Sequence, residues 1–110
     1  MRKKGRKICC GTVAWPFLSQ ARRLVAEGVA PGGSRNNAKN MRARAEVGDG
    51  VSEDDFLLVC DAQTSGGLLV ALPDAEAEAY AARCRERGAP AGAVVGRVVD
   101  AGGAPLRVEN

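Results

Sequence analysis

The residues of this chain best suited to chemistry lie in the stretch CDAQTSGGLLVAL, residues 60–72. Consecutive small residues let backbone N–H groups converge on an anion, and Thr64 and Ser65 add two hydroxyl donors. Gly66 and Gly67 have no Cβ, so a ligand or another backbone can come close to them. Asp61 is placed to bind a cation or to orient Thr64. Short Gly-rich loops often match by chance, so local physics alone favours a structural turn before a buried strand over phosphate contact.

A second stretch of small residues, PGGSRNN, covers residues 31–37. Its Arg35 offers a guanidinium that is able to fork onto a phosphate or a carboxylate. A solvated surface loop is the favoured alternative, because most such loops lie at the surface. Two small-residue loops that flank one core would be a coincidence if neither had a ligand, which raises the hypothesis that they face each other.

Several reaction classes do not fit the sequence. The chain has no His, which excludes a nucleophile activated by histidine. The Walker spacing and the G-x-S-x-G elbow are absent. The four cysteines show no CxxC spacing, which disfavours a zinc site, and reduced cysteines are typical of a cytoplasmic protein. Cys9 and Cys10 have only Lys7 nearby to activate a thiolate, which disfavours a catalytic thiol.

Charge divides the 110 residues into two unlike halves. Residues 1–45 contain eleven Lys or Arg and one acid, whereas residues 46–110 contain five against twelve. This split is typical of a basic half with an acidic partner, or of two halves that attract each other. The first residues, MRKKGRK, have no interleaved aromatic residues, so a solvated tail is favoured over a nucleic-acid arm. A secretory signal is disfavoured because Gly11 and Pro16 interrupt the apolar segment, and no apolar run reaches bilayer length.

Apolar periodicity and capping residues predict the elements of a single small domain. Helices are expected from Phe17 to Gly28, over residues 52–60 and over 74–87, with a polar loop over 31–40. A buried strand is the alternative for residues 52–60. The run LLVAL, residues 68–72, is typical of a buried strand. Residues 93–99 and 105–108 are expected to form two strands of a hairpin joined by DAGGA. The order of elements indicates an α+β or α/β fold.

Three stretches in this order resemble the C-terminal portion of selenophosphate synthetase, also called selenide, water dikinase. They are PFLSQARRLVAEGVAPGGSRNN, CDAQTSGGLLVALP and VVGRVV, and the resemblance covers residues 15–110. The D-x-Q-T-S-G-G-L-L pattern is highly specific to that family. The resemblance implies an α+β fold, part of an aminoimidazole-ribonucleotide-synthetase-like C-terminal domain, which in the family follows an N-terminal ATP-binding domain. It also implies an enzyme, a homodimer in its complete form, that makes selenophosphate from ATP, selenide and water, with Mg²⁺.

The same resemblance assigns roles to residues. It implies that the 64–67 loop lines a cleft facing the ATP-binding domain, and that the family's catalytic, ATP-binding and magnesium-binding residues lie upstream of the matching part. We therefore expect no catalytic residue and no metal ligand here, and no tight nucleotide binding by a fragment that is inactive alone. The alternative function is a non-catalytic module that binds phosphate or a nucleotide, or is purely structural. Residues 1–14 fit neither part of the family pattern and are expected to be unrelated and disordered. The cleft-lining candidates are Gly32, Gly33, Ser34, Arg35, Asn37, Asp61, Gln63, Thr64, Ser65, Gly66 and Gly67.

Overall fold

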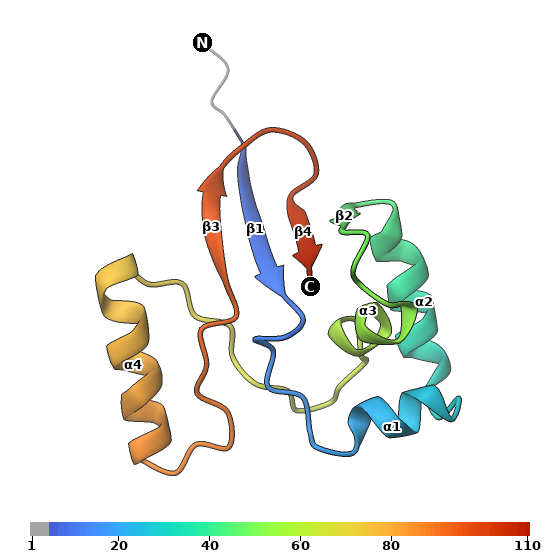
Figure 1. Cartoon of the computed structure of the whole chain (residues 1–110), viewed down its shortest axis with the longest axis horizontal. Helices are drawn as coiled ribbons and strands as arrows, with labels where there is room; N and C mark the ends of the chain where they lie inside the picture. The colour runs from blue at the N-terminus through green and yellow to red at the C-terminus, as the bar shows by residue number, and fades with distance from the viewer. Residues whose placement is uncertain (1–4) are drawn as a thin grey trace.

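The computed structural model describes residues 5–110 and shows a mixed sheet of four strands with helices beside it (Figure 1). The strands lie in the order β2-β4-β1-β3. β1 pairs parallel with β4 and antiparallel with β3, and β2 pairs parallel with β4. The architecture is thus α+β, as expected. The strand bounds are β1 Arg6–Gly11, β2 Ala45–Val47, β3 Gly96–Asp100 and β4 Leu106–Glu109.

The most important difference from the sequence prediction is β1. Disorder is wrong for residues 6–11, because they form an interior strand that is paired along both edges. The two strands predicted near residues 93–99 and 105–108 are present as β3 and β4. They do not form a hairpin, because β1 lies between them in the sheet (Figure 1). Lys7, one of the cations of this segment, is buried and forms an ion pair with Glu46. Residues 1–4, the rest of the basic run, lie outside the described residues.

The core lies on one face of the sheet. Side chains alternate between the faces of a strand, so Cys10 of β1 and Val108 of β4 point to the same side, where they meet Phe56. Phe56 and Val108 are essentially inaccessible to solvent. The opposite face carries Lys7, Glu46 and Arg107, which pair with one another. One face is therefore apolar and the other is charged.

Helix α1, Ala21–Ala26, ends as the sequence predicts, although it begins later than Phe17. Gly28 has φ 85°, the left-handed conformation that favours glycine after a helix. The next segment differs from the prediction, because the expected loop at 31–40 is helix α2, Gly32–Arg42. Polar residues such as Ser34 and Asn37 compete with helical backbone only when their side chains have no other partners. Here both have tertiary partners, so the helix continues through them.

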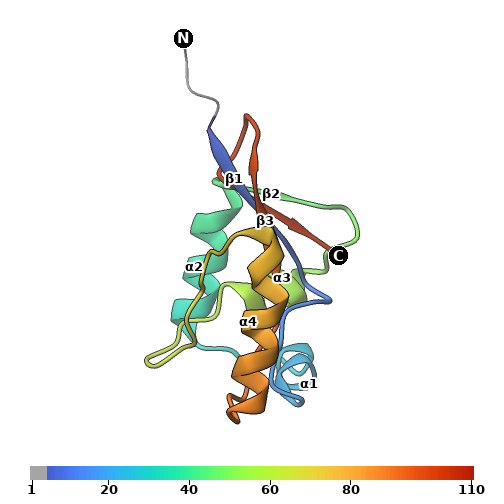
Figure 2. The ribbon, with the colours of Figure 1, turned by 90° about the vertical axis from the view of Figure 1, so that its left-hand side faces the viewer.

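Helices α3, Glu53–Val59, and α4, Asp74–Glu86, confirm two predictions. The Ser52 hydroxyl accepts a hydrogen bond from the Asp55 N–H, which caps α3. The strand expected at residues 68–72 is absent, and Leu68 is 94% exposed. A strand needs a partner edge, and this segment runs toward α4 without one. Figure 1 shows α4 apart from the other helices, and in Figure 2 it lies in front of them, toward the viewer.

Within residues 5–110, no helix has the length and apolar character required to cross a bilayer.

Candidate functional site

The two small-residue stretches meet at Ser34 and Asp61. Ser34 lies in the first turn of α2 and is fully buried. Its hydroxyl donates to Asp61 Oδ1 at 2.5 Å and accepts the Ala62 N–H at 3.0 Å. One side chain thus binds the carboxylate and the backbone at the start of the DAQTSGG loop. We name the contact of Ser34 with residues 61–62 the Ser34–Asp61 junction.

Two further contacts hold the same junction. Asn37, one turn beyond Ser34, donates from Nδ2 to the Cys60 carbonyl at 3.1 Å. A Cβ atom at Gly33 would stand 3.4 Å from the Ala62 Cβ, an ordinary van der Waals distance, so α2 and the loop lie against each other here. The hypothesis that the two stretches face each other is confirmed for Gly33, Ser34, Asn37 and Asp61.

The remaining loop candidates lie outside the junction. Gln63 donates from Nε2 to Asp61 Oδ2 at 3.3 Å. A Cβ at Gly66 would stand 2.8 Å from Gln63 Oε1, so the loop folds back on its own glutamine. Thr64, Ser65 and Gly67 are exposed, and neither hydroxyl is hydrogen-bonded to another residue within 5–110. The fold therefore separates the hydroxyl donors from the residues that anchor the loop.

Arg35 and Gly32 also lie apart from the junction, on the outer side of α2. Arg35 donates from Nη2 to the Gly28 carbonyl at 3.2 Å. Gly32 has open space where a Cβ would stand. Arg35 lines a different hollow, which lies between α2 and α3.

A cavity of about 410 Å³ adjoins the junction. Asn37, Cys60 and Asp61 contribute to its wall, together with residues that the sequence did not single out. The sequence could have indicated two of them, Asn40 and Met41, because residues three and four positions beyond Asn37 share its face of a helix. Because residues 31–40 are predicted to be a loop, the sequence prediction does not include this helical spacing. The added lining residues are Asn40, Met41, Val59 and Leu106.

The donors around Asp61 do not fit a magnesium ion. Both carboxylate oxygens of Asp61 already accept hydrogen bonds, from Ser34 and Gln63. Mg²⁺ needs six oxygen ligands near ideal octahedral geometry, usually with free carboxylate oxygens. No group of three His, Cys, Asp or Glu able to hold a metal occurs within residues 5–110. Asp61 therefore has a structural role here, because its two hydrogen bonds hold the start of the loop in place.

The cysteines of the described chain are thiols. Burial raises the pKa of Cys10, and the neighbouring Cys9 raises it further. Burial also raises the pKa of Cys60, although the positive charge of Arg42 opposes the effect. A raised pKa keeps a thiol protonated at neutral pH, whereas a nucleophile needs the thiolate. Cys10 and Cys60 are thus poorly suited to nucleophilic chemistry.

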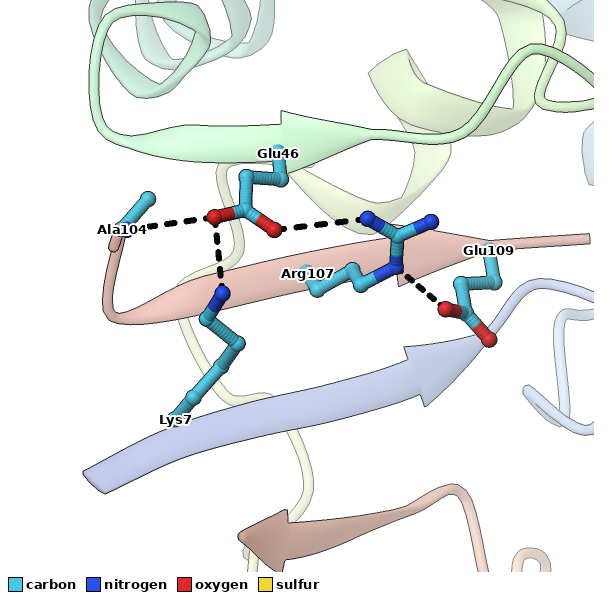
Figure 3. A network of polar contacts seen from close by, with 5 residues as sticks. All are labelled: Lys7, Glu46, Ala104, Arg107 and Glu109. Carbon is cyan, nitrogen blue, oxygen red and sulfur yellow. Dashed lines mark hydrogen bonds and ion pairs between the residues drawn. The ribbon is translucent and has the colours of Figure 1, made fainter. Parts of the chain in front are cut away.

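An ion-pair network that sequence reasoning missed spans three strands of the sheet (Figure 3). Glu46 of β2 accepts hydrogen bonds from Lys7 at 2.7 Å, from Arg107 at 3.3 Å and from the Ala104 N–H at 3.3 Å. The hydrogen bond from Lys7, followed by that from Arg107, lowers the pKa of Glu46. Glu109, and then Glu46, raise the pKa of Arg107. The network fastens β1, β4 and β2 together.

Comparisons with known proteins show that the chain is similar to one part of each of several dikinases. No family model matches the chain. The relatives are selenide, water dikinases. That of Rhizobium meliloti is 39% identical over 95 residues, which are 86% of this chain and 27% of the relative. Selenide, water dikinase 2 of Peptoclostridium acidaminophilum is 38% identical over 84 residues, 76% of this chain and 24% of the relative.

A third relative gives the same picture. The selenide, water dikinase of Aliarcobacter butzleri is 33% identical over 84 residues, 76% of this chain and 24% of that protein. The chain thus spans about a quarter of the length of the curated relatives it matches. The resemblance drawn from the sequence motifs is confirmed at this level.

Proposed function

We propose that the chain serves as a C-terminal part of a selenide, water dikinase, an enzyme that forms selenophosphate from ATP, selenide and water. The observation that carries the proposal is the Ser34–Asp61 junction, which joins two of the three stretches on which the family resemblance rests. In this proposal the fold belongs to the aminoimidazole-ribonucleotide-synthetase-like C-terminal type. Its function is to hold the 64–67 loop in a fixed place.

The proposed task of the loop is to line a cleft that faces an ATP-binding domain. Support comes from the separation of roles in the loop: Asp61 is anchored, whereas the hydroxyls of Thr64 and Ser65 are exposed and free for a partner or a phosphate. ATP and Mg²⁺ would be held mainly by the ATP-binding domain, since the carboxylate here is already engaged. A cytoplasmic homodimer is the proposed setting.

A chimera tests this function directly. The matched quarter of the Rhizobium meliloti relative is replaced by this chain, and selenide-dependent AMP formation is measured with ATP and Mg²⁺. We expect activity from the chimera and none from the purified chain alone, because phosphoryl transfer requires metal-held phosphates. An inactive chimera that folds and dimerises would contradict the proposal. AMP formation by the chain alone would contradict the need for the other domain.

Variants of the chimera test the role of the loop. Replacing Thr64 and Ser65 together by Ala should lower kcat/KM by about tenfold or more, as expected when donors near a phosphate are lost. Ser19→Ala is the matched control, since Ser19 is an exposed hydroxyl outside residues 31–37 and 60–72. Equal activity of the double variant and the control would remove the loop hydroxyls from the cleft.

A further inference from the structure

Two of the three cations without an ion pair in the first half of the described chain, Arg35 and Lys39, lie on α2, and the third, Arg44, follows its end. Arg6, Lys7, Arg22 and Arg23 each pair with a carboxylate. Of the cations on α2, Arg42 pairs with Glu53, whereas Arg35 and Lys39 have no carboxylate within 4.0 Å among residues 5–110. α2 contains no acidic residue. The helix therefore presents a cationic face on which Arg35 and Lys39 have no carboxylate partner among residues 5–110.

This face borders a groove between α2 and α3. Arg35, Lys39 and Arg42 follow one another at intervals of four and three residues, which places them on one side of the helix. The groove has a volume of about 310 Å³. Its opposite wall is the acidic first turn of α3, and apolar side chains complete the lining. Those further lining residues are Ala38, Glu53, Asp54 and Leu57.

Two of the three cations are held in place before any ligand arrives. The Arg42 guanidinium lies over the Phe56 ring, 4.6 Å from its centroid. The Arg35 guanidinium is fixed by its hydrogen bond to the Gly28 carbonyl. A guanidinium has five N–H donors, so each keeps donors for an anion. Preorganised cations lose less conformational freedom on binding than mobile ones.

We propose that the α2/α3 groove binds a phosphate monoester of a small hydroxyl-bearing molecule, such as a sugar phosphate. The phosphate lies against Arg35 and Lys39, with Arg42 as the third cation. The carboxylates of Glu53 and Asp54 accept hydrogen bonds from hydroxyls of the attached group. The volume is at the lower end for small-molecule pockets, which suits a ligand of this size. This site is independent of the proposed dikinase function.

Binding is tested by calorimetry at low salt with ribose 5-phosphate, inorganic phosphate and ribose as separate probes. We expect ribose 5-phosphate to bind more tightly than inorganic phosphate, and ribose alone to give no heat. Equal affinity for the two phosphates would contradict the hydroxyl contacts, and no heat from either would overturn the site. Tighter binding of a single-stranded oligonucleotide through the same residues would replace it by a polynucleotide surface.

Matched variants identify the residues. R35Q/K39Q should weaken ribose 5-phosphate binding by about tenfold or more, because two charged donors are lost. R83Q/R87Q, at the end of α4, removes equal charge from exposed sites and should leave affinity unchanged. Circular dichroism verifies that both variants fold. Equal weakening in the two variants would show a general charge effect and overturn the site.

A gain of affinity provides a second, opposite readout. Glu53 competes with the ligand for Arg42, so Glu53→Gln should tighten inorganic phosphate binding by about threefold. Glu76→Gln, on α4, removes the same charge elsewhere and should have no effect. If Glu53→Gln and Glu76→Gln bind phosphate alike, Arg42 is not part of the site and the three-cation arrangement is wrong.

Discussion

Lys7 Nζ lies 2.7 Å from Glu46 Oε1, and this ion pair joins two strands that are not neighbours in the sheet (Figure 3). Lys7 belongs to β1 and Glu46 to β2, and β4 runs between them. The side chain of Lys7 is only 9% exposed. Its charge is therefore removed from water and stabilised by one main partner.

Replacing Lys7 by Met should lower the midpoint of thermal unfolding by about 4–8 °C. The substitution keeps the apolar stem but leaves Glu46 without its principal donor. Arg6→Met is the matched control, because Arg6 is on the same strand and its ion pair with Asp100 is exposed at both ends. Exposed pairs contribute little, so the control should shift the midpoint hardly at all. Equal shifts would mean that Lys7 acts only through net charge.

The pH dependence of stability should reveal Glu46. Its pKa is lowered in the folded state, first by the hydrogen bond from Lys7 and then by that from Arg107. A lowered folded pKa contributes stability that is complete above the unfolded value, near 4.5, and is lost as pH falls toward the folded value. Urea unfolding between pH 6 and pH 3, measured for the natural chain and for Glu46→Gln, should show the steeper acid loss in the natural chain. Parallel curves would contradict this assignment.

Ser34 should be important for stability, whereas Ser65 should not. Ser34→Ala leaves the Ala62 N–H without its acceptor and Asp61 Oδ1 without its donor in a partly buried contact, and should cost about 1–3 kcal/mol. Ser65→Ala removes an exposed hydroxyl and should change the free energy of unfolding by less than about 0.5 kcal/mol. Chemical denaturation measures both. A larger effect at Ser65 would show that the loop is anchored through its hydroxyls.

Phe56 carries the small core. It is 1% exposed, and Phe56→Ala should destabilise the fold by about 3–5 kcal/mol through the cavity it leaves. Leu68→Ala removes an apolar side chain that is 94% exposed and should have almost no effect. A comparable loss at Leu68 would indicate that residues 68–72 are packed in solution.

Removing residues 1–14 tests the corrected role of the N-terminal segment. β1 supplies the pairing partner of both β3 and β4, so its loss should abolish cooperative unfolding and native amide dispersion in NMR spectra. A truncated chain that retained both would show that residues 15–110 fold without β1.

Local signals in the sequence were sufficient for α3, α4 and the end of α1. Ser52 caps α3, acids and bases occupy the expected ends of α4, and Gly28 ends α1. These features depend on neighbours within a few residues, which a sequence displays directly. The family motifs likewise pointed to Ser34, Asn37 and Asp61.

The errors all concern long-range partners. β1 looks like a basic tail because its acidic partner, Glu46, lies 39 residues away. Residues 31–40 look like a loop because the partners of Ser34 and Asn37 lie beyond α3. Residues 68–72 look like a strand by composition alone, yet no edge receives them within the described chain. Whether a residue is stable in a helix or a strand depends on which distant residues contact its side chain in the folded protein.

The interior place of β1 sets the order of events during synthesis. Ile8 pairs with Leu106 and Lys7 with Val99, so β1 has its strand partners only in β3 and β4, which are made much later. Contacts this distant in sequence slow folding, because a long loop must close before any of them forms. While the chain emerges from the ribosome, β1 remains an unpaired strand until β3 and β4 have been made. The sheet is completed only once β4 has been made, and until then β1 is the strand that most needs protection from aggregation.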